Sequence, residues 1–180
     1  MIVAVTGHRP TGLWGYSPNR NYAYMRQELA RRLLEFIQKR KADRFLFGMA
    51  LGVDSMAFDV CTKIREQLHP EVRLVAAVPY ADQAQHWDPE HRQRYRHRLD
   101  VADEVVRVDE LPEYAVPKVP VGIYDPAKLL ARNQYLVDQA DLVLAVWTEV
   151  ERGGTYDTVC RARKAGRELV IYNPKKFYGW

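Results

Sequence analysis

The chain has 180 residues, of which 47% are hydrophobic and 28% are charged, so it is long enough for one domain with a buried core. Its formal net charge of +4 is only mildly basic and does not indicate a protein dedicated to coating DNA. No apolar run approaches the roughly 20 residues of a membrane-spanning helix, and the apolar start ends at Thr6-Gly7 without a signal-peptide pattern. Two cysteines, Cys61 and Cys160, lack CxxC spacing. We therefore expect a cytoplasmic protein without membrane contact.

Short apolar runs alternate with amphipathic stretches along the chain. The apolar runs predict strands at residues 2–6, 44–48, 72–79, 104–108, 141–147 and 168–172. The amphipathic stretches predict helices at residues 21–41, 53–68, 126–140 and 155–165, and the polar stretch 88–102 is a further predicted helix. Strands that are apolar throughout are typical of a parallel sheet covered on both faces. The sequence predicts a single three-layer, Rossmann-like α/β domain over residues 1–180, with a mostly parallel sheet of about six strands.

The segment 110–125 is the longest predicted connection. It contains Pro112, Pro117, Pro120 and Gly122 and lies between a predicted strand and a predicted helix. Connections of this length in a compact domain are uncommon. We interpret it either as a lid or as an irregular excursion of the chain.

Glycines mark three loops in which a predicted strand is followed by a helix: 6–12, 48–55 and 148–155. In open parallel sheets, ligands bind outside the carboxyl ends of the strands. Glycine lets backbone amides approach a phosphate, and a helix N-terminus favours negative charge. None of the loops matches GxGxxG or the Walker pattern, which disfavours a standard dinucleotide oxidoreductase or P-loop enzyme. The loops therefore predict a site for a phosphate-bearing ligand.

Each candidate residue also has a purely structural explanation. The glycines can serve turn geometry alone, and Asp54 can be an ordinary carboxylate in the first turn of a helix. Arg9 can be a surface arginine. Arg132 and Asn133 can be a helix-surface arginine and an amide bonded within the core.

The motifs resemble those of the SLOG superfamily of Rossmann-like proteins, which includes the LOG phosphoribohydrolases, the DprA DNA-processing proteins and the YpsA-type proteins. Residues 5–10 (VTGHRP) are similar to the first-strand motif of YpsA proteins, and residues 48–54 (GMALGVD) to a glycine motif of the DprA and YpsA groups. Residues 153–155 (GGT) lie where the superfamily has its second glycine-rich loop. Pro79-Tyr80 followed by Trp87, and the segment 132–141 (RNQYLVDQAD), resemble further YpsA motifs. The order is the same from residue 1 to about 172, so the chain is identified as a YpsA-type member of the superfamily.

The resemblance implies a nucleotide-type ligand such as AMP, ADP-ribose or an NAD-like molecule, with no cofactor required. The ligand-binding residues that it implies are Thr6, Gly7, His8, Arg9, Gly48, Gly52, Asp54, Pro79, Arg132, Asn133, Gly153, Gly154 and Thr155. Trp14, Tyr80 and Trp87 are candidates for stacking on a base. The resemblance is also compatible with a homo-oligomer.

Hydrolysis of nucleoside monophosphates, as in LOG enzymes, is one alternative. Their PGGxGTxxE motif carries an acid/base glutamate, and the corresponding position here is Thr158, whose hydroxyl cannot act as that base. The adjacent Asp157 points about 100° away around the helix. Glu149 and Glu151 are nearby in the sequence and could replace the glutamate. We therefore expect no catalytic residue, and binding or sensing rather than cleavage.

Single-stranded DNA binding, as in DprA, is the other alternative. Such sites combine a basic groove with aromatic platforms. The chain offers aromatic residues interleaved with arginines, namely Trp14, Tyr16, Tyr22, Tyr24, Trp87, Tyr95, Arg9, Arg20, Arg92, Arg94, Arg96 and Arg98. The most basic segment, 90–98, can also be a solvated helix face. No pair of histidines has the i,i+4 spacing of a helical metal site, so no metal is expected.

Overall fold

The computed structural model describes residues 1–17 and 19–178, and in this part of the chain six strands form one sheet. The strands are β1 (Ile2–Gly7), β2 (Arg44–Phe47), β3 (Arg73–Val78), β4 (Glu104–Arg107), β5 (Leu142–Val146) and β6 (Glu168–Tyr172). Their order is β4-β3-β2-β1-β5-β6, and every neighbouring pair is parallel. The predicted α/β class with about six mostly parallel strands is confirmed.

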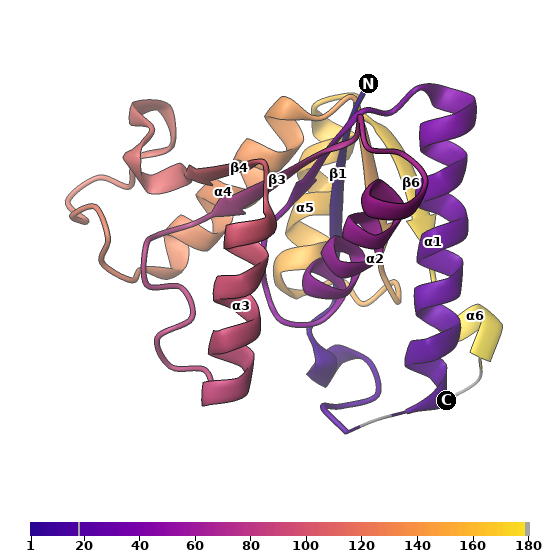
Figure 1. Ribbon diagram of the computed structural model, residues 1–180. Helices are drawn as coiled ribbons and strands as arrows, with labels where there is room; N and C mark the ends of the chain where they lie inside the picture. The colour runs from indigo at the N-terminus through magenta and orange to yellow at the C-terminus, as the bar shows by residue number, and fades with distance from the viewer. Residues whose placement is uncertain (18, 179–180) are drawn as a thin grey trace.

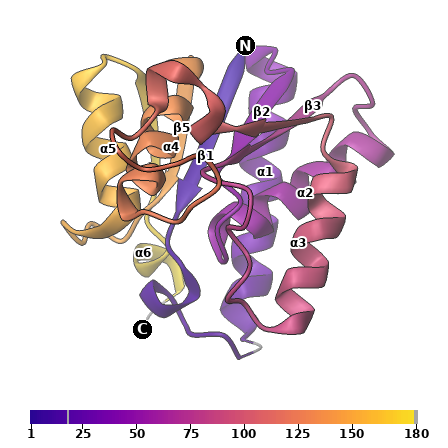
Figure 2. The same ribbon diagram turned by 90° about the vertical axis from the view of Figure 1, so that its left-hand side faces the viewer.

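Helices cover both faces of the sheet, as Figures 1 and 2 show. One face carries α1 (Arg20–Arg40), α2 (Val53–Gln67) and α3 (Pro89–Val101), and the other carries α4 (Pro126–Gln139) and α5 (Gly153–Lys164). Shorter elements are η1 (Pro10–Gly12), η2 (Val108–Glu110), η3 (Pro112–Tyr114) and α6 (Lys175–Tyr178). The predicted start of the fifth helix at Thr155 is wrong by two residues, because Gly153 and Gly154 already belong to its first turn.

The core has two sides because side chains alternate along each strand. Val3, Val5 and Phe45 pack toward α1 and α2, whereas Ala4 and Leu46 pack toward α4 and α5. Both sets are buried, which explains why the strands are apolar throughout. The edge strand β4 is the exception and is largely exposed.

The sheet changes winding direction between β1 and β5. The chain runs outward from β1 to β4, returns through α4 and places β5 on the other side of β1. The connections that follow β1 and β5 therefore leave toward opposite faces, and a crevice opens at the carboxyl ends of these strands. The loops 6–12 and 148–155 meet there.

A buried ion pair holds the segment 110–125 against α4. Lys128 Nζ lies 2.8 Å from Asp109 Oδ2 and donates a 2.6 Å hydrogen bond to the carbonyl oxygen of Pro120. The amide of Gly122 donates to the same Asp109 oxygen over 2.8 Å. The segment is thus fixed to the start of α4 through Pro120 and Gly122.

None of the helices within residues 1–17 and 19–178 is long and apolar enough to cross a membrane. In the same ranges, no group of three or more His, Cys, Asp or Glu side chains is arranged to hold a metal ion.

Removing the charge of Lys128 should destabilise the fold strongly. In Lys128→Met, the Asp109 carboxylate stays buried without its cation, and breaking a buried pair in this way costs about 3–5 kcal/mol. The free energy of unfolding from urea titrations measures the effect. Lys39→Met, which removes an exposed ion pair with Glu35, is the control and should change stability little. Equal losses in the two variants would contradict the importance of the buried pair.

Candidate functional site

A cavity of about 470 Å³ lies in the crevice between β1 and β5. Its walls come from the loop after β1 and from the first turns of α2, α4 and α5. The lining residues are Thr6, Gly7, His8, Arg9, Thr11, Gly12, Ala50, Asp54, Pro126, Leu129, Leu130, Arg132, Asn133, Arg152, Gly153, Gly154 and Thr155. Residues more than 120 positions apart in the sequence thus face one space.

Most of the predicted site residues line this cavity. These are Thr6, Gly7, His8, Arg9, Asp54, Arg132, Asn133, Gly153, Gly154 and Thr155. The predicted residues that are not part of the lining are Gly48, Gly52, Pro79, Trp14, Tyr80 and Trp87.

Gly48 and Gly52 have a packing function that the sequence interpretation missed. A Cβ atom at Gly48 would lie 2.1 Å from a guanidinium nitrogen of Arg132, and the Gly48 carbonyl accepts a hydrogen bond from that group. A Cβ atom at Gly52 would lie 2.4 Å from the carbonyl oxygen of His8, and Gly52 has a φ of +107°. Glycine is needed at Gly52, where backbone atoms approach and φ is positive, so that the loop after β2 can contact the loop after β1, whereas the atoms nearest to Gly48 are the ends of the Arg132 and Asp54 side chains.

Asp54 and Arg132 form a buried pair at the base of the cavity. Arg132 Nη1 lies 4.0 Å from Asp54 Oδ2, and both side chains are more than nine-tenths buried. Burial raises the pKa of Asp54 to about 6, although Arg132, the amides of Ala50 and Gly7, and Arg9 oppose this rise. Burial also lowers the pKa of Arg132, against the effect of Asp54. Asp54 thus becomes protonated near pH 6 instead of near pH 4.

His8 connects the two loops that border the crevice. Its Nε2 atom accepts a 3.0 Å hydrogen bond from the amide of Thr148 and lies 2.9 Å from the Thr148 hydroxyl oxygen. Burial and, to a lesser extent, the charge of Lys175 lower the pKa of His8. A neutral imidazole fits its function as an acceptor, so His8 positions the loop after β5.

The N-terminus of α5 is open toward the cavity. Gly153, Gly154 and Thr155 form its first turn, and its N-cap, Arg152, makes no side-chain capping hydrogen bond. The first amides of a helix have no partner within the helix and carry a partial positive charge. Arg9 and Arg152 are exposed at the same cavity. These groups can bind a phosphate, whereas the first amides of α2 already bond to His8 and Ala50.

An apolar wall of the cavity was not predicted. Pro126, Leu129 and Leu130 of α4 line it, and Leu130 is 42% exposed. In the sequence pattern, Leu129 and Leu130 share one predicted side of the helix with the core residues Leu136 and Val137. A signal was present, because adjacent residues on a helix lie about 100° apart and Leu129 and Leu130 cannot both face the core.

The three aromatic residues proposed for base stacking are engaged elsewhere. Trp14 packs edge-on against Tyr22, with ring centroids 5.2 Å apart. Trp87 packs in the same way against Tyr95 at 5.3 Å. Tyr80 is buried and lies at the edge of the Tyr124 ring. Pro126, Leu129 and Leu130 are therefore better placed than these rings to contact an apolar part of a ligand.

No carboxylate other than that of Asp54 lines the cavity among the described residues. Thr158, at the position of the LOG glutamate, is fully buried and donates to the carbonyl oxygen of Gly154. Asp157 accepts hydrogen bonds from Asn133 and Arg161. Glu149 pairs with Lys176 at 2.9 Å, which also keeps its pKa low. Neither Glu149 nor Glu151 is part of the lining.

Comparisons with known proteins agree with the motifs. The YpsA family model, described as the YspA SLOG family, matches residues 3–168. The chain belongs to this family. It is 33% identical over 142 residues to the SPbeta prophage-derived protein YoqJ of Bacillus subtilis, covering 78% of this chain and 82% of YoqJ. It is 28% identical over 153 residues to a UPF0398 protein of Halalkalibacterium halodurans, covering 84% of this chain and 75% of that protein.

A solved structure supports the fold of this SLOG protein. DNA processing protein A from Helicobacter pylori, described for its single-stranded DNA binding mode, superimposes with a TM-score of 0.56 at 18% identity. The match covers 95% of this chain and 64% of that chain, so this chain spans less than two thirds of the DNA-processing protein. At this identity the likeness concerns the fold.

Gly52→Ala should destabilise the fold more than Gly166→Ala. Both glycines have positive φ, so alanine is strained at either position by about 1–2 kcal/mol. Only at Gly52 would the new Cβ also collide with a backbone carbonyl, whereas nothing lies within 4 Å at Gly166. Thermal unfolding of both variants measures the difference. If the two melting temperatures fall equally, the close approach of the loops at Gly52 is not important.

Proposed function

We propose that this SLOG protein binds a nucleotide-derived, phosphate-bearing ligand in the β1–β5 crevice and does not cleave it. The observation that carries the proposal is the open first turn of α5, which shares one cavity with Arg9 and Arg152. Three arginines line the cavity against one aspartate, and that aspartate is paired with Arg132. The surplus positive charge favours an anion.

The two ends of the cavity suggest how a nucleotide would lie. Its phosphate would accept hydrogen bonds from the amides at Gly154 and Thr155 and pair with Arg9. The base or ribose would contact the apolar wall formed by Leu129 and Leu130. Pockets of this size with an apolar wall and a few convergent polar groups are typical of small-ligand sites.

The absence of a suitable base argues against the phosphoribohydrolase alternative. General acid/base catalysis at a glycosidic bond needs a carboxyl group within hydrogen-bond reach of the reacting atoms. Among the described lining residues only Asp54 has one, and it lies at the base of the cavity against Arg132. We therefore favour recognition or sensing of the nucleotide.

The DNA-binding neighbour suggests single-stranded DNA as a second ligand class for this chain. The crevice is less suited to it than to a mononucleotide, because no Phe, Tyr or Trp ring belongs to the described cavity lining, and the one imidazole there, that of His8, is bonded to Thr148. Stacking of bases on aromatic side chains is a main source of affinity in single-strand sites. The basic residues 92–98 lie on α3, away from the crevice.

Ligand binding should raise the melting temperature. With AMP, ADP, NAD or ADP-ribose present at 100 times its dissociation constant, the folded state gains about 2.7 kcal/mol. Differential scanning fluorimetry can screen the four compounds, and calorimetric titration can measure the affinity. Arg9→Ala should weaken the best ligand at least tenfold, whereas Lys164→Ala, a surface change on α5, should not. A lack of stabilisation by all four compounds would count against the proposal.

Anion affinity should increase as the pH falls through 6. The pKa of Asp54 is raised to about 6 by burial, so the carboxylate is ionised at pH 7.5 and protonated at pH 5. Protonation removes the negative charge that offsets Arg132, and a bound anion would raise the same pKa further. A further rise of one pKa unit would change the affinity about tenfold.

ADP-ribose is the suitable probe for this pH dependence, because each of its phosphates keeps one charge between pH 5 and 7.5. Its affinity for Asp54→Asn should vary much less over that range. This variant also separates the effect of Asp54 from that of His8, whose pKa lies below its usual value. An equal pH dependence in both proteins would assign the effect to another group.

A further inference from the structure

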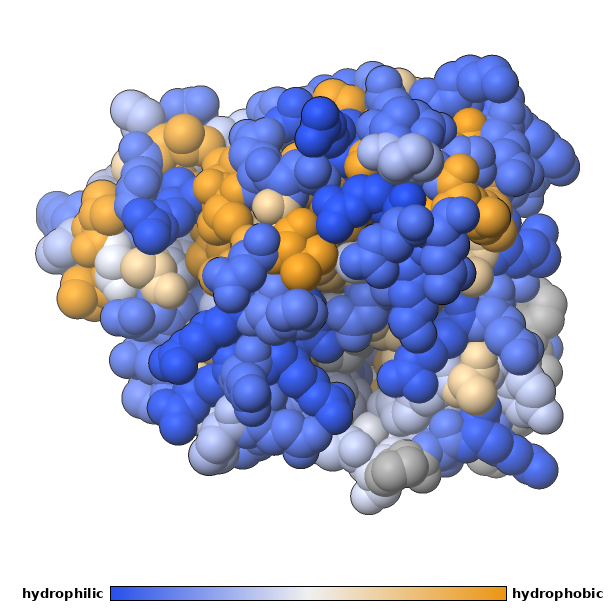
Figure 3. Space-filling view, in the orientation of Figure 1, coloured by the Kyte–Doolittle hydropathy of each residue, from blue (hydrophilic) through white to orange (hydrophobic). Residues whose placement is uncertain are grey.

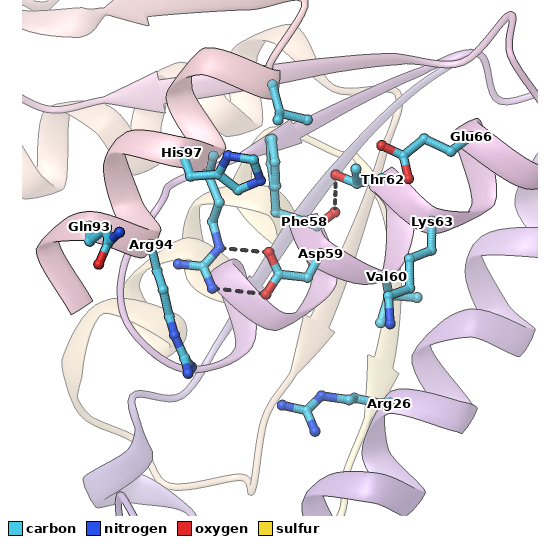
Figure 4. A pocket seen from close by; sticks show the side chains of 12 residues that line it. Arg26, Phe58, Asp59, Val60, Thr62, Lys63, Glu66, Gln93, Arg94 and His97 are labelled. Carbon is cyan, nitrogen blue, oxygen red and sulfur yellow. Dashed lines mark hydrogen bonds and ion pairs between the residues drawn. The ribbon is translucent and has the colours of Figure 1, made fainter. Parts of the chain in front are cut away.

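A second hollow, of about 650 Å³, lies between α2 and α3 on the opposite side of the sheet from α4. Figure 4 shows Arg94 and His97 of α3 along one wall and Asp59 and Lys63 of α2 along the other, with Arg26 of α1 beside them. We call this hollow the α2–α3 groove. It shares no lining residue with the crevice.

An ion pair between α3 and α2 crosses the groove. Arg98 donates two hydrogen bonds to the carboxylate of Asp59, over 2.7 and 2.8 Å. In Figure 4, the side chains of Arg26, Lys63 and Arg94 all extend toward the end of the groove below this ion pair. Three cations from three different helices thus border one end of the groove.

Two of these cations have no carboxylate partner in the described part of the chain. Arg26 and Lys63 form no ion pair among residues 1–17 and 19–178, and Arg94 pairs only with the exposed Glu90 of its own helix. Elsewhere on the surface, arginines such as Arg31 and Arg65 are bound to carboxylates. Unpaired cations that face a shared groove favour an anionic occupant.

The positive charge continues around α3. Arg92 and Arg96 lie on the side of the helix away from the groove and also form no ion pair among the described residues. Figure 3 shows that this face of the molecule is predominantly hydrophilic over α2 and α3. Charge spread along a helix fits a flexible polyanion better than a folded partner with one contact face.

An exposed aromatic ring lies near the first turn of α3. The Tyr16 side chain is 59% exposed, and its ring centroid lies 6.2 Å from that of His91. His91 precedes Arg94 by three residues and therefore lies on the same side of α3. A basic groove next to an accessible aromatic ring has the composition of sites that bind single-stranded nucleic acids.

We propose that the α2–α3 groove binds a single-stranded nucleic acid. Arg26, Lys63 and Arg94 contact its phosphates, and an unpaired base stacks on Tyr16. A duplex keeps its bases stacked within the helix and cannot offer that contact. The site is separate from the crevice and does not depend on nucleotide binding there.

Fluorescence anisotropy with a fluorescein-labelled oligothymidylate of about 20 nucleotides tests the proposal. The full-length protein should bind at low salt, with log affinity falling linearly as log salt concentration rises. Loss of two phosphate contacts in Arg26→Gln/Lys63→Gln should reduce the salt slope by about 1.4, because each contact to a single strand contributes about 0.7. At about 0.1 M salt, this difference corresponds to a roughly 25-fold loss of affinity. Tyr16→Ala should weaken binding without changing the slope.

Lys118→Gln/Lys164→Gln is the matched control. It lowers the net charge by the same two units at positions outside the groove, and neither lysine forms an ion pair among the described residues. Its slope and affinity should stay near those of the unchanged protein. All four substituted side chains are exposed, and thermal unfolding checks that both double variants remain folded.

Four results would overturn the proposal. Three are a lack of binding even at about 50 mM salt, an equal loss in the groove and control variants, and displacement by polyglutamate as effective as by unlabelled oligothymidylate. The last result would indicate an acidic protein segment as the partner. Loss of binding in Arg9→Gln but not in the groove variant would place the strand in the crevice. This fourth result would also refute binding in the α2–α3 groove. Because nucleotide binding is measured separately, either site can fail without the other.

Discussion

The contact between Arg132 and the loop after β2 is the interaction on which the crevice depends. Arg132 reaches from α4 across the carboxyl edge of the sheet, donates to the Gly48 carbonyl and lies 4.0 Å from Asp54. It thereby joins the helices on the two faces of the sheet. A buried arginine is tolerated there because a carboxylate and a carbonyl oxygen compensate its charge. A side chain at Gly48 would displace the guanidinium from this position.

The N-termini of α2 and α5 both border the cavity, but they differ in whether their first amides already have hydrogen-bond partners. The first turn of α2 is occupied by contacts with His8 and Ala50, so it stabilises the fold. The first turn of α5 has no side-chain cap and borders exposed arginines, so it is available to a ligand. Glycine-rich loops of similar appearance thus differ in their hydrogen bonds within the fold.

Positive charge is distributed over two separate surfaces. In the crevice it is concentrated in a small cavity with an apolar wall, which suits a compact nucleotide. Along α3 it is spread over an exposed helix beside an open groove, which suits an extended strand. The net charge of +4 gives no indication of this division, because many of the remaining charges are paired on the surface.

The sequence by itself determined the fold class, because apolar runs and amphipathic stretches report burial directly. It also located the loops at the carboxyl ends of the strands, and through Thr158 it pointed away from glycosidic hydrolysis. Tertiary structure alone decided what each residue contacts. It assigned Gly52 to packing, placed the partly buried Trp14 and Trp87 against the core, and brought Leu129 and Leu130 to the cavity. Local patterns record whether a residue is buried, whereas its partner depends on how distant segments meet at the edge of the sheet.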